Sequence, residues 1–422
     1  MKFMRKCRYL TQDNVLLLSS ILIIAVGQFA SKTQSDVLVL FSLMMTGTIS
    51  FILEKEYLFP FLFFLIAPNR LLTLGPLSAP TIVMIAGIMR NRLSIRKSLF
   101  AEFFFLEAFS LLTVFIDSPV ILDAFKTIVV LLFIDSFSSN IDINRQYARC
   151  MKAAVYGCIV SFVFSILLDP SSFKENGRFA FSSSGQNVLG ILCAVLAINL
   201  LVTIIQKSDD AKSEMILWLG GLLIIGFFTG SRSFLLAMGV GVSTVLLISF
   251  LRMDVRRIGK VVGICIALCS IAFILYTNSV FIRGYVDKFA YRMTKLSNVD
   301  VSNGRYDLWA QYIDVFLQNP KYLLFGNLNP QKYGIEYVAH NMIIEQIADF
   351  GIIGSIIIVI MYIDVFYSIM KVNDYSLMWR YLLPSAFALL SASMVSHTML
   401  GIPQTMMLYL CFSGALILNT RS

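Results

Sequence analysis

The chain has 422 residues, of which 58% are apolar and 14% are charged, and its mean hydropathy is +0.79. A soluble protein of this length needs more polar surface than this composition offers, so a soluble globular fold is excluded. The formal net charge is +9, and cytoplasmic loops that face an anionic leaflet explain such a charge without nucleic acid. We therefore expect a polytopic protein that contacts membrane lipids and binds no nucleic acid.

Apolar runs long enough to cross a bilayer recur along the whole chain. A spanning helix needs about 20 mostly apolar residues. We predict fourteen spans, at 15–30, 37–52, 57–74, 77–89, 99–116, 120–137, 153–168, 187–206, 214–229, 233–251, 261–277, 342–369, 381–398 and 404–419. The third contains Pro60 and Pro68 and the fourth follows Pro76, so these two form either separate spans or one re-entrant or broken unit. The predicted architecture is all-α with 12 to 14 transmembrane helices.

The basic residues predict the orientation, because Lys and Arg are retained in short loops on the cytoplasmic side. With the N- and C-termini in the cytoplasm, 21 of the 34 Lys and Arg fall in cytoplasmic segments and 5 in short outside segments. No signal-peptide cleavage pattern follows the first apolar run, so we keep it as a span. We expect one integral membrane domain, residues 1–422, with an extracytoplasmic loop inserted at 278–339. None of the 7 cysteines lies in that loop, so no disulfide framework is expected there.

The long loop contains one helical pattern, between Tyr306 and Leu317. Apolar residues recur there at three-to-four spacing, which is typical of an amphipathic helix; they are Leu308, Trp309, Tyr312, Ile313 and Phe316. Asn319-Pro320 follows and is expected to end the helix. We expect this helix to lie on the outer face of the membrane.

Four polar motifs fall on the predicted outer face. They are Asn176-Gly177-Arg178, the turn Thr229-Gly230-Ser231-Arg232-Ser233, Asn303-Gly304-Arg305, and His340-Asn341. An arginine pairs with phosphate oxygens through two parallel hydrogen bonds, so these motifs are candidates for binding a phosphorylated lipid. The alternative is that each arginine reaches toward lipid headgroups without a specific ligand.

His340 is one of only two histidines and stands where the long loop meets an apolar run. An imidazole titrates close to neutral pH, so His340 is a candidate general base; the alternative is a histidine that only forms hydrogen bonds at the start of a helix. The other histidine, His397, is expected to be structural. Asn341, Glu345 and Asp349 repeat every four residues and form a polar stripe that must avoid lipid. Glu345 either orients a catalytic group or pairs with a cation such as Lys126.

These motifs, in this order, resemble the bacterial O-antigen ligase and polymerase family. The resemblance is carried by the Thr229–Ser233 turn, by Asn303-Gly304-Arg305, by Asn319-Pro320 with Phe325-Gly326, and by His340-Asn341 followed by Asp349-Phe350-Gly351. The stretch from Gly177-Arg178 to Gln186-Asn187 is similar to a looser signature of that family. Each motif is short, and together they cover about the second half of the chain.

The resemblance implies a metal-independent, inverting glycosyltransferase of the all-helical C-type architecture in the bacterial inner membrane, with its site facing the periplasm. Its donor and acceptor would be undecaprenyl-pyrophosphate-linked oligosaccharides, and a chain-length regulator protein is a further expected partner. Arg232 and Arg305, with Arg178, would bind the donor pyrophosphate, and His340 would activate the acceptor hydroxyl. Ser231, Asn341 and Glu345 would support them. No Walker or Gly-x-Gly-x-x-Gly pattern occurs, so no nucleotide cofactor is expected.

Several activities remain open at this point. A polymerase would transfer the glycan to another lipid-linked repeat unit, whereas a ligase would transfer it to the lipid A core. The Phe-rich composition, with 35 Phe, favours the more diverse polymerases. A lipid-linked oligosaccharide flippase would instead need polar or broken-helix sites near the middle of the membrane, and a scaffold without catalysis would not need His340.

Overall fold

The computed structural model describes residues 11–75, 77–90, 97–113, 121–138, 143–168, 179, 186–206, 212–251, 255–297, 304–369, 375–395 and 402–419. The described chain folds into α-helices joined by short 3-10 turns and one two-stranded hairpin, so the predicted all-α class is confirmed. The helices before the long loop are α2 (Gln12–Thr33), α3 (Asp36–Ile52), α4 (Leu58–Ile66), α5 (Ala79–Arg90), α6 (Lys97–Thr113), α7 (Ile121–Ser138), α8 (Ile143–Leu168), α9 (Gln186–Gln206), α10 (Lys212–Phe228), α11 (Arg232–Leu251) and α12 (Val255–Asn278). The later helices are α13 (Val280–Ser297), α14 (Arg305–Gln318), α15 (Pro320–Phe325), α16 (Met342–Ile369), α17 (Tyr375–Ser393) and α18 (Ile402–Asn419). The short elements are η1 (Lys55–Tyr57), η2 (Asn69–Leu72), β1 (Thr73–Leu74), β2 (Leu77–Ser78) and η5 (Pro330–Tyr333).

Several of these helices have the length and composition of membrane spans. Among the described residues, five segments meet both conditions: Gln12–Thr33, Gln146–Leu168, Gln186–Ile205, Arg232–Leu251 and Met342–Tyr367. Each of the fourteen predicted spans overlaps at least one helix. The protein is therefore an all-helical chain with several membrane-spanning candidates, and the full set of 12 to 14 spans stays a prediction.

Non-helical backbone separates the helices of the third and fourth predicted spans, and both alternatives for these spans stay predictions. All nine residues of α4 are buried, and η2 and the antiparallel hairpin β1–β2 separate α4 from α5. Gly157 of α8 packs against the backbone of Phe64, where a side chain would not fit, so α8 lies close against α4. Non-helical backbone at membrane depth is tolerated where protein covers it, and Leu71 and Leu72 of η2 are indeed buried.

Basic residues gather where several helices begin or end together. Arg90 donates to the carbonyls of Ser50 and Leu53 at the end of α3, both at 2.6 Å, and Lys260 donates to Ile205 at the end of α9. Arg149 and Lys152, near the start of α8, pair with Glu56 and Glu214, each at 3.6 Å. The positive-inside rule assigns all four of these cations to the cytoplasm. Their grouping agrees with that assignment, while the side of the membrane that they face stays a prediction.

The long loop is mostly helical. The predicted amphipathic helix is α14, Asn319 caps its C-terminus, and Pro320 begins α15. The prediction missed α13 completely. Of the apolar residues that carry the predicted spacing, Tyr312 and Phe316 are buried, whereas Ile313 is 47% exposed.

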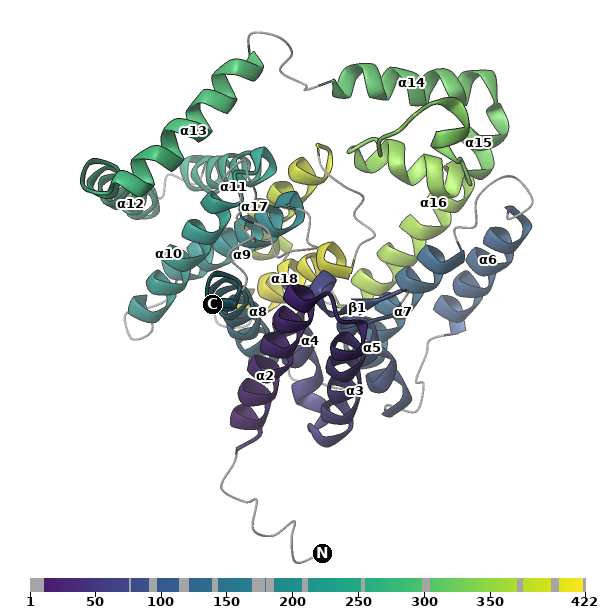
Figure 1. Ribbon diagram of the computed structural model, residues 1–422, viewed down its shortest axis with the longest axis horizontal. Coiled ribbons are helices and arrows are strands. Elements are labelled where there is room, and N and C mark those ends of the chain that lie inside the picture. The colour runs from purple at the N-terminus through teal and green to yellow at the C-terminus, as the bar shows by residue number, and fades with distance from the viewer. Residues whose placement is uncertain are drawn as a thin grey trace, which may run out of the picture.

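α14, α15 and the first part of α16 form a separate unit with its own hydrophobic core. Figure 1 shows them grouped at the upper right, away from the body made by α2–α5 and α8–α11. The buried residues of this second core are Tyr312, Val315, Phe316, Tyr322, Leu328, Ile335, Ala339 and Ala348. We call this group of elements, residues 304–350, the outer unit.

Two glycines, Gly326 and Gly351, allow the outer unit to pack in close backbone contact at the kink in α16. Gly351 breaks the helix with φ +64° and ψ −180°, and Gly326 follows α15 with φ +73° and ψ −146°; both lie in a backbone region that is essentially restricted to glycine. A Cβ on Gly351 would overlap the backbone of Leu324 and Phe325, and a Cβ on Gly326 would overlap the backbone around Gly351. The predicted single span at 342–369 is thus kinked, because α15 crosses it in backbone contact.

We expect Gly351→Ala to destabilise the protein by about 1–3 kcal/mol or more, because it combines a forbidden backbone conformation with a steric overlap. The matched control is Gly239→Ala on α11, where a Cβ meets no atom within 4 Å and alanine is the better helix former. Thermal unfolding of the purified protein in detergent measures both. Equal midpoints for the two variants would contradict this account of the kink.

Candidate functional site

The turn that carries Arg232 is held in a fixed conformation by its own hydroxyl groups. Thr229 Oγ1 donates to the carbonyl of Gly226 at 2.6 Å, and the N–H of Ser231 donates to Thr229 Oγ1 at 3.2 Å. Gly230 supplies a φ of +55° between them. Arg232 is then the first residue of α11, so its position is set by a turn with little conformational freedom.

The start of α9 packs directly against this turn. Ser231 Oγ donates to Asn187 Oδ1 at 3.0 Å. A Cβ on Gly190 would overlap Ser231, so glycine is what allows the two elements to approach. The Asn187 motif and the Arg232 motif, which are separate in the sequence, therefore form one structure.

Tyr285 of α13 covers the other side of the turn and was not among the predicted site residues. Its hydroxyl lies 3.1 Å from the carbonyl of Phe227 and 2.8 Å from that of Phe228, at the end of α10. Its ring contacts both phenylalanine rings, with centroids 5.3 and 5.0 Å away. The signal that could have found it is the spacing of Ile282, Tyr285 and Val286, which is helical.

Arg305 comes close to Arg232 from a different element. It is the first residue of α14, and its guanidinium donates to the carbonyl of Val395, just after α17, at 2.6 Å. Burial lowers the pKa of Arg305, and the positive charge of Arg232 lowers it further. The fold therefore holds two like charges near each other in a partly buried place.

The chain before His340 runs antiparallel to α14. The hydroxyl of Tyr312 donates to the carbonyl of Tyr337 at 3.2 Å, and the indole N–H of Trp309 donates to that of Ala339 at 2.7 Å. From Tyr337 to Ala339 the segment advances by two residues, while its partner on α14 moves back from Tyr312 to Trp309, which is about one helical turn. The next residue is His340, and Arg305 lies about one turn before Trp309 on α14.

His340 has an unusual backbone conformation that the start of α16 stabilises. Its φ is +51°, which is uncommon for any residue except glycine. Its N–H donates to Glu345 Oε1 at 2.8 Å, while Asn341 Oδ1 accepts from the N–H groups of Ile343 and Ile344. Glu345 thus contacts the backbone of the histidine, and both predicted roles of its carboxylate stay predictions. Asn341 acts as the N-cap of α16.

Tyr312 lies beneath the same carboxylates. Burial, together with the charges of Glu345 and Asp349, raises the pKa of Tyr312 to about 12. It therefore stays protonated at neutral pH and can keep donating to Tyr337. The polar stripe of α16 therefore faces the interior of the outer unit. This placement keeps it away from lipid, where exposed polar and charged side chains are energetically costly.

Some of the predicted residues cannot be placed. Arg178, Asn303 and His397 lie outside the described residues. Next to Arg178, Phe179 is described, and its N–H donates to the carbonyl of Phe228 at 2.8 Å. The structure thus brings Ser231 and Arg232 near Arg305, and the hydrogen bonds of α14 bring the segment of His340, Asn341 and Glu345 to the same helix.

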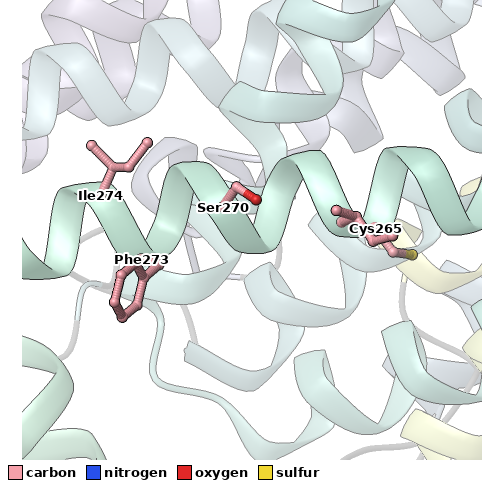
Figure 2. Close-up of a pocket in the computed structure, with 5 residues that line it drawn as sticks. Cys265, Ser270, Phe273 and Ile274 are labelled. Atoms are coloured by element: carbon pink, nitrogen blue, oxygen red, sulfur yellow. The ribbon is translucent and has the colours of Figure 1, made fainter.

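An open hollow on one helix, α12, is lined by Cys265, Ile266, Ser270, Phe273 and Ile274, and it contains one hydroxyl and one thiol (Figure 2). No group of three or more His, Cys, Asp or Glu side chains that could hold a metal ion occurs within the described ranges.

We expect Tyr285→Phe to loosen the Arg232 turn without unfolding it, because the carbonyls of Phe227 and Phe228 keep their bonds to Gly230 and Phe179. One lost hydrogen bond contributes about 1 kcal/mol, so amide hydrogen exchange at 227–233 should become about five times faster. Tyr291→Phe is the control, since Tyr291 is 63% exposed on the same helix. Unchanged exchange in Tyr285→Phe would show that Tyr285 does not hold this turn.

Comparison of the chain with protein-family models, with curated proteins and with solved structures finds no match in any of the three. The function of the site must therefore be inferred from its own residues.

Proposed function

We propose that the protein is an O-antigen polymerase, or a polymerase of a related surface polysaccharide, in the bacterial inner membrane. It transfers an undecaprenyl-pyrophosphate-linked glycan onto a lipid-linked repeat unit at the periplasmic face. The support is the set of polar groups described above together with the resemblance of their motifs. His340 acts as base, Arg232 and Arg305 bind the donor pyrophosphate, and Arg178 is proposed to join them.

The proximity of Arg232 and Arg305 is the observation that carries this proposal. Two guanidinium groups that repel each other are both stabilised by an anion that binds between them. Both arginines are also the first residues of helices, where the N–H groups and the helix dipole already favour an anion. A ligand with several negative charges, such as a pyrophosphate, would offset the repulsion between the two guanidinium groups and would also be attracted by both helix N-termini.

The reaction breaks one bond and forms one. The acceptor hydroxyl oxygen attacks the anomeric carbon of the donor, and the bond from that carbon to the pyrophosphate oxygen breaks with its electron pair going to the pyrophosphate. The proton of the hydroxyl passes to a ring nitrogen of His340. The two guanidinium groups stabilise the charge that develops on the leaving pyrophosphate, and attack from the opposite side inverts the anomeric configuration.

The backbone of His340 supports a functional role for its side chain. A residue with φ near +50° costs about 1–2 kcal/mol compared with glycine, yet the chain carries a histidine there. The hydrogen bond from His340 N–H to Glu345 helps to maintain this conformation. Strained residues of this kind are concentrated at functional sites.

The transporter alternative has in its favour the broken unit between Pro60 and Pro80, where Asn69 and Arg70 follow the nine apolar residues of α4. Transporters place polar groups on broken helices to bind substrate or ions. A ligase remains the main competitor, because it uses the same donor and differs only in its acceptor.

We expect His340→Asn and Arg305→Lys each to reduce glycan transfer about 100-fold or more. Asparagine tolerates a positive φ, so His340→Asn removes the base while preserving the local backbone. Lysine keeps the charge of Arg305 but lacks its two-pronged hydrogen bonding. The cell's polysaccharide, separated on a gel, reports the outcome. Loss of polymerase activity leaves lipid A core with a single repeat unit, whereas loss of ligase activity leaves polymer on the lipid carrier.

Arg283→Lys provides the matched control, because Arg283 is an exposed arginine of α13 that donates to Tyr276 and Thr277. It should give the wild-type ladder. Wild-type ladders from both His340→Asn and Arg305→Lys would refute the proposed function, and polymer retained on the carrier would assign the protein as a ligase.

A further inference from the structure

Two aromatic side chains, Tyr306 and Trp309, lie beside the proposed reaction centre and have no role in the reaction proposed above. Tyr306 follows Arg305 directly and is 66% exposed. The ring of Trp309 is partly buried and meets Tyr306 edge to face, with centroids 5.5 Å apart and an angle of 78° between the planes. The bond from the Trp309 indole N–H to the carbonyl of Ala339 fixes this ring next to the residue that precedes His340.

We propose that Tyr306 and Trp309 form a sugar-binding subsite, which holds a pyranose ring of the glycan next to the bond being made. This inference rests on the proposed function, because it takes the glycan as substrate. The C–H groups on one face of a pyranose carry partial positive charge and are attracted to the electron-rich face of an aromatic ring. The hydroxyl groups around the ring remain in water, which suits a half-exposed pair better than a closed cavity.

The position of the pair fits this ligand. On one side, Arg305 is proposed to bind the pyrophosphate, to which the first sugar of the donor is attached. On the other side, the segment held by Trp309 leads into His340, where the acceptor hydroxyl must lie. A sugar ring bound at Tyr306 and Trp309 therefore lies between the group that leaves and the group that attacks.

The charges around the pair argue against a membrane surface as its ligand. Aromatic residues at a bilayer interface are common, and an anionic leaflet attracts neighbouring cations. The exposed charged side chains on α14 are the carboxylates of Asp307 and Asp314, which repel an anionic surface; Ala310, Gln311, Ile313, Leu317 and Gln318 are also exposed. In Figure 1, α14 lies beyond the first part of α16, on the far side from the main helical body. A neutral, hydrated ligand is favoured over an anionic lipid headgroup.

The test measures sugar binding separately from transfer. The probe is the free oligosaccharide repeat unit, released from the cell's own polysaccharide and lacking both lipid and pyrophosphate, and the signal is Trp309 fluorescence in the full-length protein. Trp309→Phe identifies the part of the signal that comes from this residue. We expect Tyr306→Ala to weaken binding about tenfold and to raise the KM for lipid-linked glycan by a similar factor. Tyr306→Phe, which keeps the aromatic face, should bind within about threefold of wild type.

Tyr291→Ala is the control, since it removes a comparably exposed tyrosine from α13 and should bind normally. The subsite is overturned if Tyr306→Ala binds the oligosaccharide as wild type does, or if Tyr306→Phe loses as much binding as Tyr306→Ala. His340→Asn separates this inference from the proposed function. Normal, Tyr306-dependent binding by His340→Asn supports the subsite even if the transfer reaction proves to be a different one.

Discussion

The backbone crossing between Gly326 and Gly351 is the constraint on which the rest of the site depends. A break in a helix leaves the preceding carbonyls in need of donors, and the N–H groups of Asn327 and Leu328 donate to Asp349 and Ala348, both at 2.9 Å. Neither glycine can be replaced without overlap. The crossing turns the first part of α16 away from its apolar remainder, so the helix start that carries Asn341 and Glu345 belongs to the outer unit.

The site is consequently assembled from two bodies with separate hydrophobic cores. Arg232 belongs to the main body, where α9, α10 and α13 hold its turn through Asn187, Phe228 and Tyr285. Arg305 and His340 belong to the outer unit. The bond from Arg305 to Val395 joins the two, because it links α14 to the chain just after α17. A binding site at this junction would receive positive charge from Arg232 of the main body and from Arg305 of the outer unit. An anion that binds both arginines would then link the two bodies.

Most of the helices and part of the site could be predicted from the sequence, because polar residues are conspicuous in such an apolar chain. The Thr229–Ser233 turn and the His340–Asn341 junction stood out for this reason, and helical spacing with Asn319-Pro320 identified α14. The kink at Gly351 could not be predicted, since it depends on contact with Gly326 from another segment. Tyr285 was missed because α13 was read as loop, and the positive φ of His340 leaves no mark in the sequence.

The account depends most directly on the outer unit facing away from the cytoplasm, which single cysteines can test. Tyr337 is 69% exposed three residues before His340, and the side chain of Glu214, near the start of α10, is 53% exposed. In intact spheroplasts, a membrane-impermeant maleimide should modify Tyr337→Cys above the wild-type background, and Glu214→Cys only after lysis. The reverse pattern would place His340 and both arginines in the cytoplasm and would contradict the account.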